Sequence, residues 1–133
     1  MSKNNKVLVL SEDDSRLRDI VTILEFIGEE QVLAGDEARA LLSSGDEESL
    51  SDIAVAVVNG EDAGVTEAIN AVCDAVQGVP FLVVGHPELK GLSDETSGRI
   101  IARMEWPLNY TKFVDSLYRA QIYRDQFSRS RER

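Results

Sequence analysis

Side chains that could carry out chemistry stand in four short segments, each at the end of an apolar run. They are the turn Ser11-Glu12-Asp13-Asp14, then Asn59, then Gly85, and last Trp106-Pro107. Adjacent carboxylates, as in the first segment, suit a hard divalent cation. The last three segments offer an amide, a glycine and an indole, none of which is an anionic nucleophile or a cation.

The elements that must position these residues alternate along the chain between short apolar runs and amphipathic stretches. Strands are expected at 6–10, 31–34, 53–58, 80–84 and 102–106, because these runs are apolar on both faces. Helices are expected at about 14–27, 36–42, 65–76, 93–101 and 110–130, and loops at 43–52 and 85–93. Asp13 or Asp14 would cap the first helix, Asp36 the second, and Asn109 the last.

Strands alternating with helices predict a parallel α/β sheet covered on both faces. Right-handed crossovers favour the five-stranded, flavodoxin-like strand order 2-1-3-4-5. In that fold the functional crevice lies at the carboxyl ends of strands one and three. The polar segments after those strands are therefore expected to meet there.

Composition and charge narrow the class of protein. The 133 residues suit one domain, which we place at 1–127, with 128–133 as the start of a linker. From Arg119 onward five arginines face two acids, so the preceding 118 residues carry a net charge of −13. Such an acidic body argues against direct contact with nucleic acid. Neither a membrane span nor a signal peptide is apparent, so a cytoplasmic location is expected.

Position by position, the residues at the strand ends resemble those of a response-regulator receiver domain. In a working receiver, two acids after the first strand hold Mg²⁺, an Asp ending the third strand accepts phosphate, and a Ser or Thr and a Lys-Pro complete the site. Here Ser11 and Glu12 take the places of the acid pair, and Asn59 takes the acceptor place, with Val57 or Val58 as alternatives.

Two further groups are lost. Gly85 replaces the hydroxyl residue and Trp106 replaces the lysine before Pro107, so only Glu12 keeps its chemical type. The resemblance implies a degenerate pocket without phosphotransfer, and also a cis bond before Pro107.

Three segments give a narrower resemblance: DIVTILEFIGEEQ, PFLVVGHP and EWPLNYTKFVDSLYRAQIYRDQF. They are similar to the amino-terminal domain of FleQ/FlrA-type flagellar master regulators. These are sigma-54-dependent enhancer-binding activators with an atypical receiver, a central AAA+ ATPase and a helix-turn-helix. The resemblance implies that ATP and cyclic di-GMP bind in the ATPase domain, outside this chain, and that no cofactor binds here.

Other residues received more ordinary interpretations. Cys73 is expected to be a buried structural thiol, and His86 a loop residue. Asp13 and Asp14 are best explained by a helix start, where the dipole favours negative charge, and no functional metal is expected. Trp106 would either fill the pocket that a phosphoryl group and a lysine would occupy, or anchor a partner at the surface.

The long terminal helix suggests pairing of two copies. It extends beyond what a monomer core requires, and its candidate self-association residues are Tyr110, Phe113, Leu117, Ile122, Tyr123 and Phe127. The favoured interpretation is a non-enzymatic, dimerising regulatory module attached to an ATPase. The alternatives are a phosphate-accepting receiver that uses a displaced acid such as Asp62, and a stand-alone pseudo-receiver adaptor.

Overall fold

The computed structural model describes residues 6–85 and 91–131, with side chains as far as Phe127. It contains a five-stranded parallel sheet in the order β2-β1-β3-β4-β5, as predicted. The strands are β1 (Lys6–Leu10), β2 (Val32–Ala34), β3 (Ile53–Asn59), β4 (Phe81–Val84) and β5 (Ile100–Met104). His86 lies outside the described residues.

The central strands are buried on both faces because their apolar runs do not alternate with polar residues. Every residue of β3 and of β4 is buried. Along β3, Ala56 and Val58 face one core cluster, while Val55 and Val57 face the other. The register pairs Leu10 with Val58 on the neighbouring strand, so β1 and β3 end side by side.

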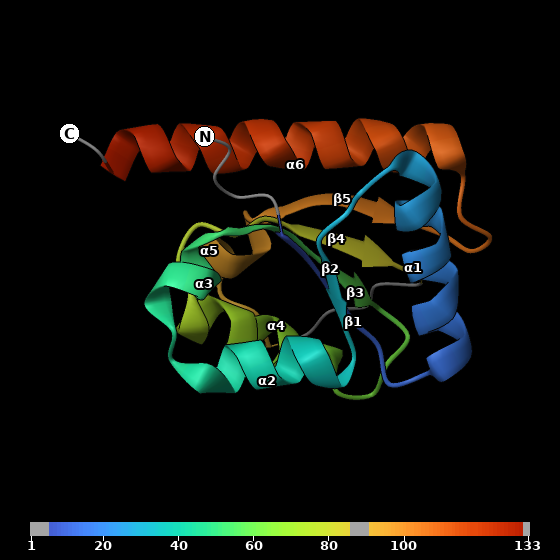
Figure 1. Cartoon of the computed structure of the whole chain (residues 1–133), viewed down its shortest axis with the longest axis horizontal. Helices are drawn as coiled ribbons and strands as arrows, with labels where there is room; N and C mark the ends of the chain where they lie inside the picture. The colour runs from blue at the N-terminus through green and yellow to red at the C-terminus, as the bar shows by residue number, and fades with distance from the viewer. Residues whose placement is uncertain (1–5, 86–90, 132–133) are drawn as a thin grey trace.

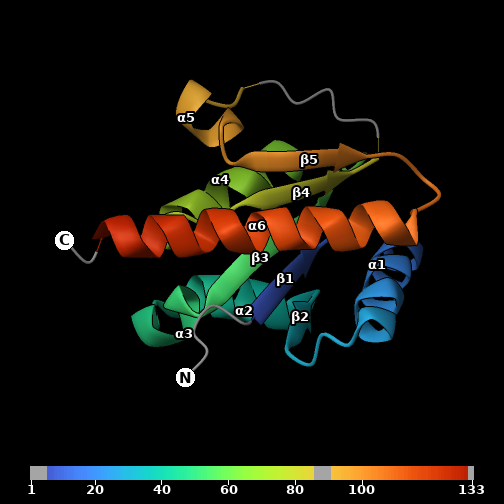
Figure 2. The ribbon, with the colours of Figure 1, turned by 90° about the horizontal axis from the view of Figure 1, so that it is seen from above.

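Helices cover the two faces of this sheet (Figure 1). One face carries α1 (Asp14–Ile27) and the long α6 (Tyr110–Arg131), which lies over the strands in Figure 2. The other face carries α2 (Asp36–Ser44), α3 (Glu47–Ser51) and α4 (Val65–Ala75), and the short α5 (Asp94–Ser97) lies beyond β5 at the edge. In the part of the chain with described structure, no helix is long and apolar enough to cross a bilayer.

The first crossover shows how local sequence sets the frame of the crevice. Asp13 caps α1, and its carboxylate accepts hydrogen bonds from the backbone N–H groups of Ser15 and Arg16. Gly28 ends the helix at φ 106°, a left-handed conformation that favours glycine. The acidic turn after β1 is thereby held at the carboxyl edge of the sheet.

Four expectations about the elements were wrong. The segment 43–52 is not all loop, because Asp46 caps the short helix α3 and Leu50 is buried under it. The second helix begins after Gly35, so Asp36 lies inside it and is not its cap.

The other two errors concern the fifth strand–helix pair. The helix after Ser93 stops at Ser97, and Ile100 and Ile101 belong to β5. The strand itself ends at Met104, so Trp106 lies in the loop that follows it.

Candidate functional site

A closed hydrogen-bond network occupies the crevice at the carboxyl ends of β1 and β3. The Asn59 side chain is 1% exposed, and its Nδ2 donates to Ser11 Oγ at 3.1 Å and to Asp62 Oδ1 at 3.1 Å. Its Oδ1 accepts from the backbone N–H of Glu61 at 3.1 Å. Both donor hydrogens and the carbonyl of this amide are therefore used inside the protein.

The loop after β3 is joined to the loop after β1 by two further bonds. The backbone N–H of Glu12 donates to Asp62 Oδ2 at 2.8 Å, and the Gly64 N–H donates to Glu12 Oε2 at 3.2 Å. Glu12, the one acid retained from the pair, thus binds backbone. Asp62 accepts from both loops, which makes it the centre of the network.

The environment of Asp62 disfavours its charged form. Burial is the main cause of the raised pKa of this carboxyl, and the negative charges of Glu12 and Asp13 raise it further, while the hydrogen bond from the Glu12 N–H opposes them. Both oxygens of this carboxylate accept hydrogen bonds within the protein, which leaves them less available to attack phosphorus. Among the described residues, no group of three or more His, Cys, Asp or Glu side chains could hold a metal ion.

Gly85 is confined by the side chains around it. It has a φ of +102°, and a Cβ built there would lie 2.7 Å from Glu61 Cγ and 3.2 Å from Trp106 Nε1. A Ser or Thr at this position would meet both neighbours. Glu61 and Trp106 therefore fill the space that a hydroxyl-bearing side chain at this position would need.

Trp106 is half-buried and covered by a cation. The Arg16 guanidinium lies 4.2 Å from the centroid of the indole ring, and Arg16 Nε is 3.9 Å from Glu61 Oε1. The ring packs on the core cluster under α1 and α6. Its Nε1–H is buried and has no acceptor in the described part of the chain. The Trp106-Pro107 bond is cis, as the receiver resemblance implied.

Trp106 also borders a depression of about 520 Å³ on the side of β5 and α6. Its lining comprises Gly85, Arg103, Met104, Glu105, Trp106, Pro107, Asn109 and Lys112. The indole therefore separates this depression from the network around Asn59. Trp106 is thus partly a core residue and partly a surface residue. This position combines features of the two interpretations drawn from the sequence.

The structure brings together most of the residues selected from the sequence. Asn59 is the residue whose side chain enters the crevice, while Val57 and Val58 face the two cores. That Asn59 takes the acceptor place stays a prediction, which this geometry favours. Sequence reasoning missed Arg16, Glu61 and Gly64. Their contacts join segments that are distant in the sequence, and no motif or spacing within either segment predicts them.

The candidate self-association residues divide into two groups. Phe113 and Leu117 are 0% and 4% exposed and pack against the sheet, so they are corrected to core residues. Tyr110 and Ile122 are exposed, whereas Tyr123 and Phe127 are half-buried.

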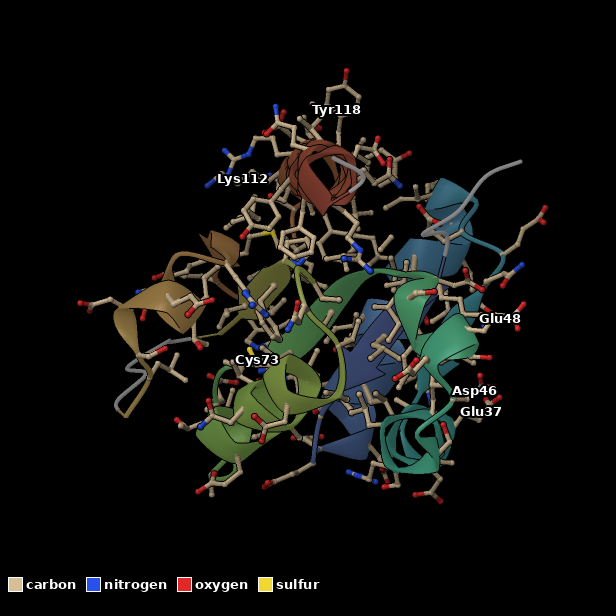
Figure 3. All side chains as sticks on the ribbon, turned by 90° about the vertical axis from the view of Figure 1, so that its left-hand side faces the viewer. Glu37, Asp46, Glu48, Cys73, Lys112 and Tyr118 are labelled. Atoms are coloured by element: carbon tan, nitrogen blue, oxygen red, sulfur yellow. The ribbon has the colours of Figure 1, made fainter. Side chains whose placement is uncertain are left out.

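The exposed residues belong to a longer apolar row on α6. We call Tyr110, Val114, Tyr118 and Ile122 the α6 stripe, because their spacing of four residues places them on one side of the helix. Tyr118 is 63% exposed and points away from the sheet (Figure 3). Phe26 of α1 extends the stripe, since its ring meets that of Tyr110 edge-on at 5.4 Å.

Comparison with known proteins gives a consistent result. The family model described as flagellar regulatory protein FleQ matches residues 6–122. The crystal structure of a response regulator receiver domain protein from Clostridium thermocellum has a TM-score of 0.71 at 14% identity, covering 92% of this chain and 98% of that chain.

Two further solved structures, FixJ-N and the response regulator StyR, share the fold. FixJ-N has a TM-score of 0.65 at 18% identity, covering 91% of this chain and 95% of that one. StyR has a TM-score of 0.70 at 17% identity, covering 96% of this chain and 64% of that one. The chain therefore has the receiver fold that the strand order indicates.

Proposed function

The chain belongs to the FleQ family of flagellar regulatory proteins, and from that membership we propose a receiver-like regulatory domain that is not phosphorylated. The observation that carries this proposal is the Asn59 amide. It stands where a receiver has its acceptor, and both its donors are bound to Ser11 and Asp62. A neutral amide does not attack phosphorus, so the aspartyl-phosphate step has no nucleophile at this position.

The surroundings of Asn59 support the same proposal. Gly85 supplies no hydroxyl, and the Lys position holds an indole under the Arg16 guanidinium. A phosphoryl group entering the crevice would have to displace internal hydrogen bonds without gaining a metal ion or an ammonium partner. In this proposal the domain is non-enzymatic and acts through its surface.

Within the full-length protein, the domain would be the first part of a sigma-54-dependent activator of flagellar and biofilm genes. An AAA+ ATPase and a helix-turn-helix would follow, with ATP and cyclic di-GMP bound there and not here, in a cytoplasmic protein. The match to StyR, which covers 64% of that chain, supports the idea that a receiver of this fold can be one part of a longer regulator.

Phosphorylation is tested by intact mass after incubation with acetyl phosphate and Mg²⁺. We expect no adduct. A gain of about 80 daltons, one phosphoryl group, would refute the proposal. If the Asp62→Asn variant then lost the adduct while Asp14→Asn kept it, Asp62 would be the displaced acceptor of an active receiver.

We further propose that two copies pair through the α6 stripe. The support is the run of exposed apolar side chains, with Tyr118 at 63% and Phe26 at 76% exposure, on a helix whose other side is already buried. Sedimentation at tens of micromolar should detect the dimer. Tyr118→Glu should weaken it at least about tenfold, whereas Ser43→Glu, which adds the same charge at an exposed position of α2 on the other face of the sheet, should not. A monomeric wild-type chain would contradict the pairing.

A further inference from the structure

Two arginine side chains come close together at the amino edge of the sheet, opposite the crevice. One of them, Arg124 of α6, is 5% exposed. Its guanidinium donates to the carbonyl oxygens of Ile53 at 2.9 Å, Gln77 at 2.8 Å and Ser51 at 3.0 Å. Ser51 ends α3 and Gln77 follows α4, so these carbonyls lie at the negative ends of helices, which stabilise a cation. Arg124 is thus well accounted for as a clamp between α6 and the sheet.

The second arginine, Arg99, is not satisfied in the same way. It lies just before β5, and its side chain is 11% exposed. Nη2 lies 3.7 Å from Glu95 Oε1, but that glutamate side chain is 85% exposed. Nη1 is buried, and no acceptor for it exists among the residues described. A buried charged donor without a partner carries a substantial free-energy cost, which an added acceptor would remove.

The two positive charges also act on each other. The pKa of the Arg124 guanidinium is lowered, mainly by burial and then by the charge of Arg99. The site therefore holds two partly desolvated like charges, and the carbonyls that surround Arg124 do not reach Nη1 of Arg99. A bound anion beside Arg99 would offset this repulsion.

A cavity of about 390 Å³ lies against the Arg99 side chain. Its lining comprises Cys73, Gln77, Glu95, Thr96, Arg99 and Phe127, from α4, α5, β5 and α6 and the turns beside them. Figure 3 shows Cys73 on the side of α4 that faces α5. Thr96 places a hydroxyl near the same space, 3.9 Å from Cys73 Sγ. Glu95 is the one acid in this lining, and its exposed side chain is free to move toward solvent.

We propose that this cavity binds one small oxyanion of the phosphate class, held by the guanidinium of Arg99, with the charge of Arg124 as second attraction. The volume accommodates a tetrahedral anion with room for a small attached group. The site is separate from the crevice at Asn59, since it lies at the opposite edge of the sheet. Because Phe127 of α6 lines the cavity, occupancy would be felt on that helix.

The test is a titration of the whole ¹⁵N-labelled chain with sodium phosphate, matched in ionic strength by sodium chloride. We expect saturable shifts in the backbone amide signals of Cys73, Thr96 and Arg99. Arg99→Gln should abolish them. Arg39→Gln should not, because Arg39 is an exposed arginine on α2 that pairs with Asp36.

A second variant decides the question even if Arg99→Gln fails to fold. Glu95→Gln removes the acid at the mouth of the cavity and leaves the arginines in place, so phosphate should bind about threefold more tightly. Unchanged or weaker binding in Glu95→Gln would overturn the proposal. So would equal shifts with chloride alone, or shifts that do not saturate.

Discussion

Replacing Asn59 by Asp tests why the crevice would not accept a phosphoryl group. The cause could be the loss of one reactive residue, or the hydrogen-bond network that occupies the crevice. This substitution restores the residue type that accepts phosphate in a receiver. It also replaces the hydrogen-bond donor of the amide with a hydrogen-bond acceptor. The Asn59 nitrogen that becomes oxygen lies 3.1 Å from Asp62 Oδ1, so two carboxylates would face each other. At an effective dielectric constant near 20, such a contact costs roughly 5 kcal/mol if both groups are charged.

Proton uptake by the pair limits this cost, because two close carboxylates can share one proton. We therefore expect Asn59→Asp to lower the free energy of unfolding by about 3 kcal/mol near neutral pH. The loss should shrink as the pH falls, since the paired carboxyls have a raised pKa in the folded state and take up the proton there first. Urea unfolding followed by circular dichroism measures both effects.

The double variant Asn59→Asp with Asp62→Asn is the matched control. It reverses donor and acceptor and leaves an oxygen on residue 62 for the Glu12 N–H. Most of the lost stability should return, with a coupling free energy of about 2 kcal/mol. An Asn59→Asp variant as stable as wild type at neutral pH, or a double variant with no recovery, would refute the network argument. Acetyl phosphate should label neither variant.

Three further predictions concern single positions, each measured by urea unfolding. Arg124→Met should lower the free energy of unfolding by about 3 kcal/mol, because three carbonyl oxygens lose their donor. Arg119→Met loses one exposed hydrogen bond and should cost less than about 1 kcal/mol. Equal losses of stability would contradict the role of Arg124 as a clamp. Gly85→Ala should lower the free energy of unfolding by at least about 1 kcal/mol more than Gly28→Ala does. The two φ values, +102° and +106°, nearly match, but only at Gly85 would the added Cβ meet another residue within 4 Å. Equal losses of stability would contradict the close packing described around Gly85. Asp62 has a raised pKa, so the folded chain holds its proton more tightly and the contribution of Asp62 to stability falls as the pH rises above 3.8. The stability of Asp62→Asn relative to wild type should therefore increase as the pH rises from 3.8 toward neutrality, and a constant difference would contradict this assignment.

The fold could be predicted because its main elements carry strong local signals. The runs at 6–10 and 53–58 are apolar on both faces, and only a parallel sheet covered by helices buries them. The same signals fail for short elements. The helix α3 rests on the Asp46 cap and one buried Leu50, and Ile100-Ile101 suits a helix or a strand until tertiary pairing with β4 decides.

The sequence allowed us to predict which receiver residues are missing from the site. It did not allow us to predict the contacts that take their place. Asn59, Gly85 and Trp106 could be placed because each lies at or just after the end of a strand, and parallel strands bring their carboxyl ends to one edge. The Arg16 stack on Trp106 joins positions far apart in the sequence, and Arg16 is one of several arginines on a helix surface. Such a contact depends on the tertiary packing, which the sequence pattern of either segment does not reveal.

Trp106 therefore means more than a missing cation. In a receiver the lysine contributes a positive charge that moves to a phosphoryl group. Here a positive charge is still present, but it belongs to Arg16 and is held by the indole face and by Glu61. Trp106→Lys would place an ammonium group beside that guanidinium and remove the ring beneath it, so repulsion would replace attraction. Restoring the lysine alone should therefore destabilise the crevice, because its ammonium group would compete with Arg16 for the carboxylate of Glu61.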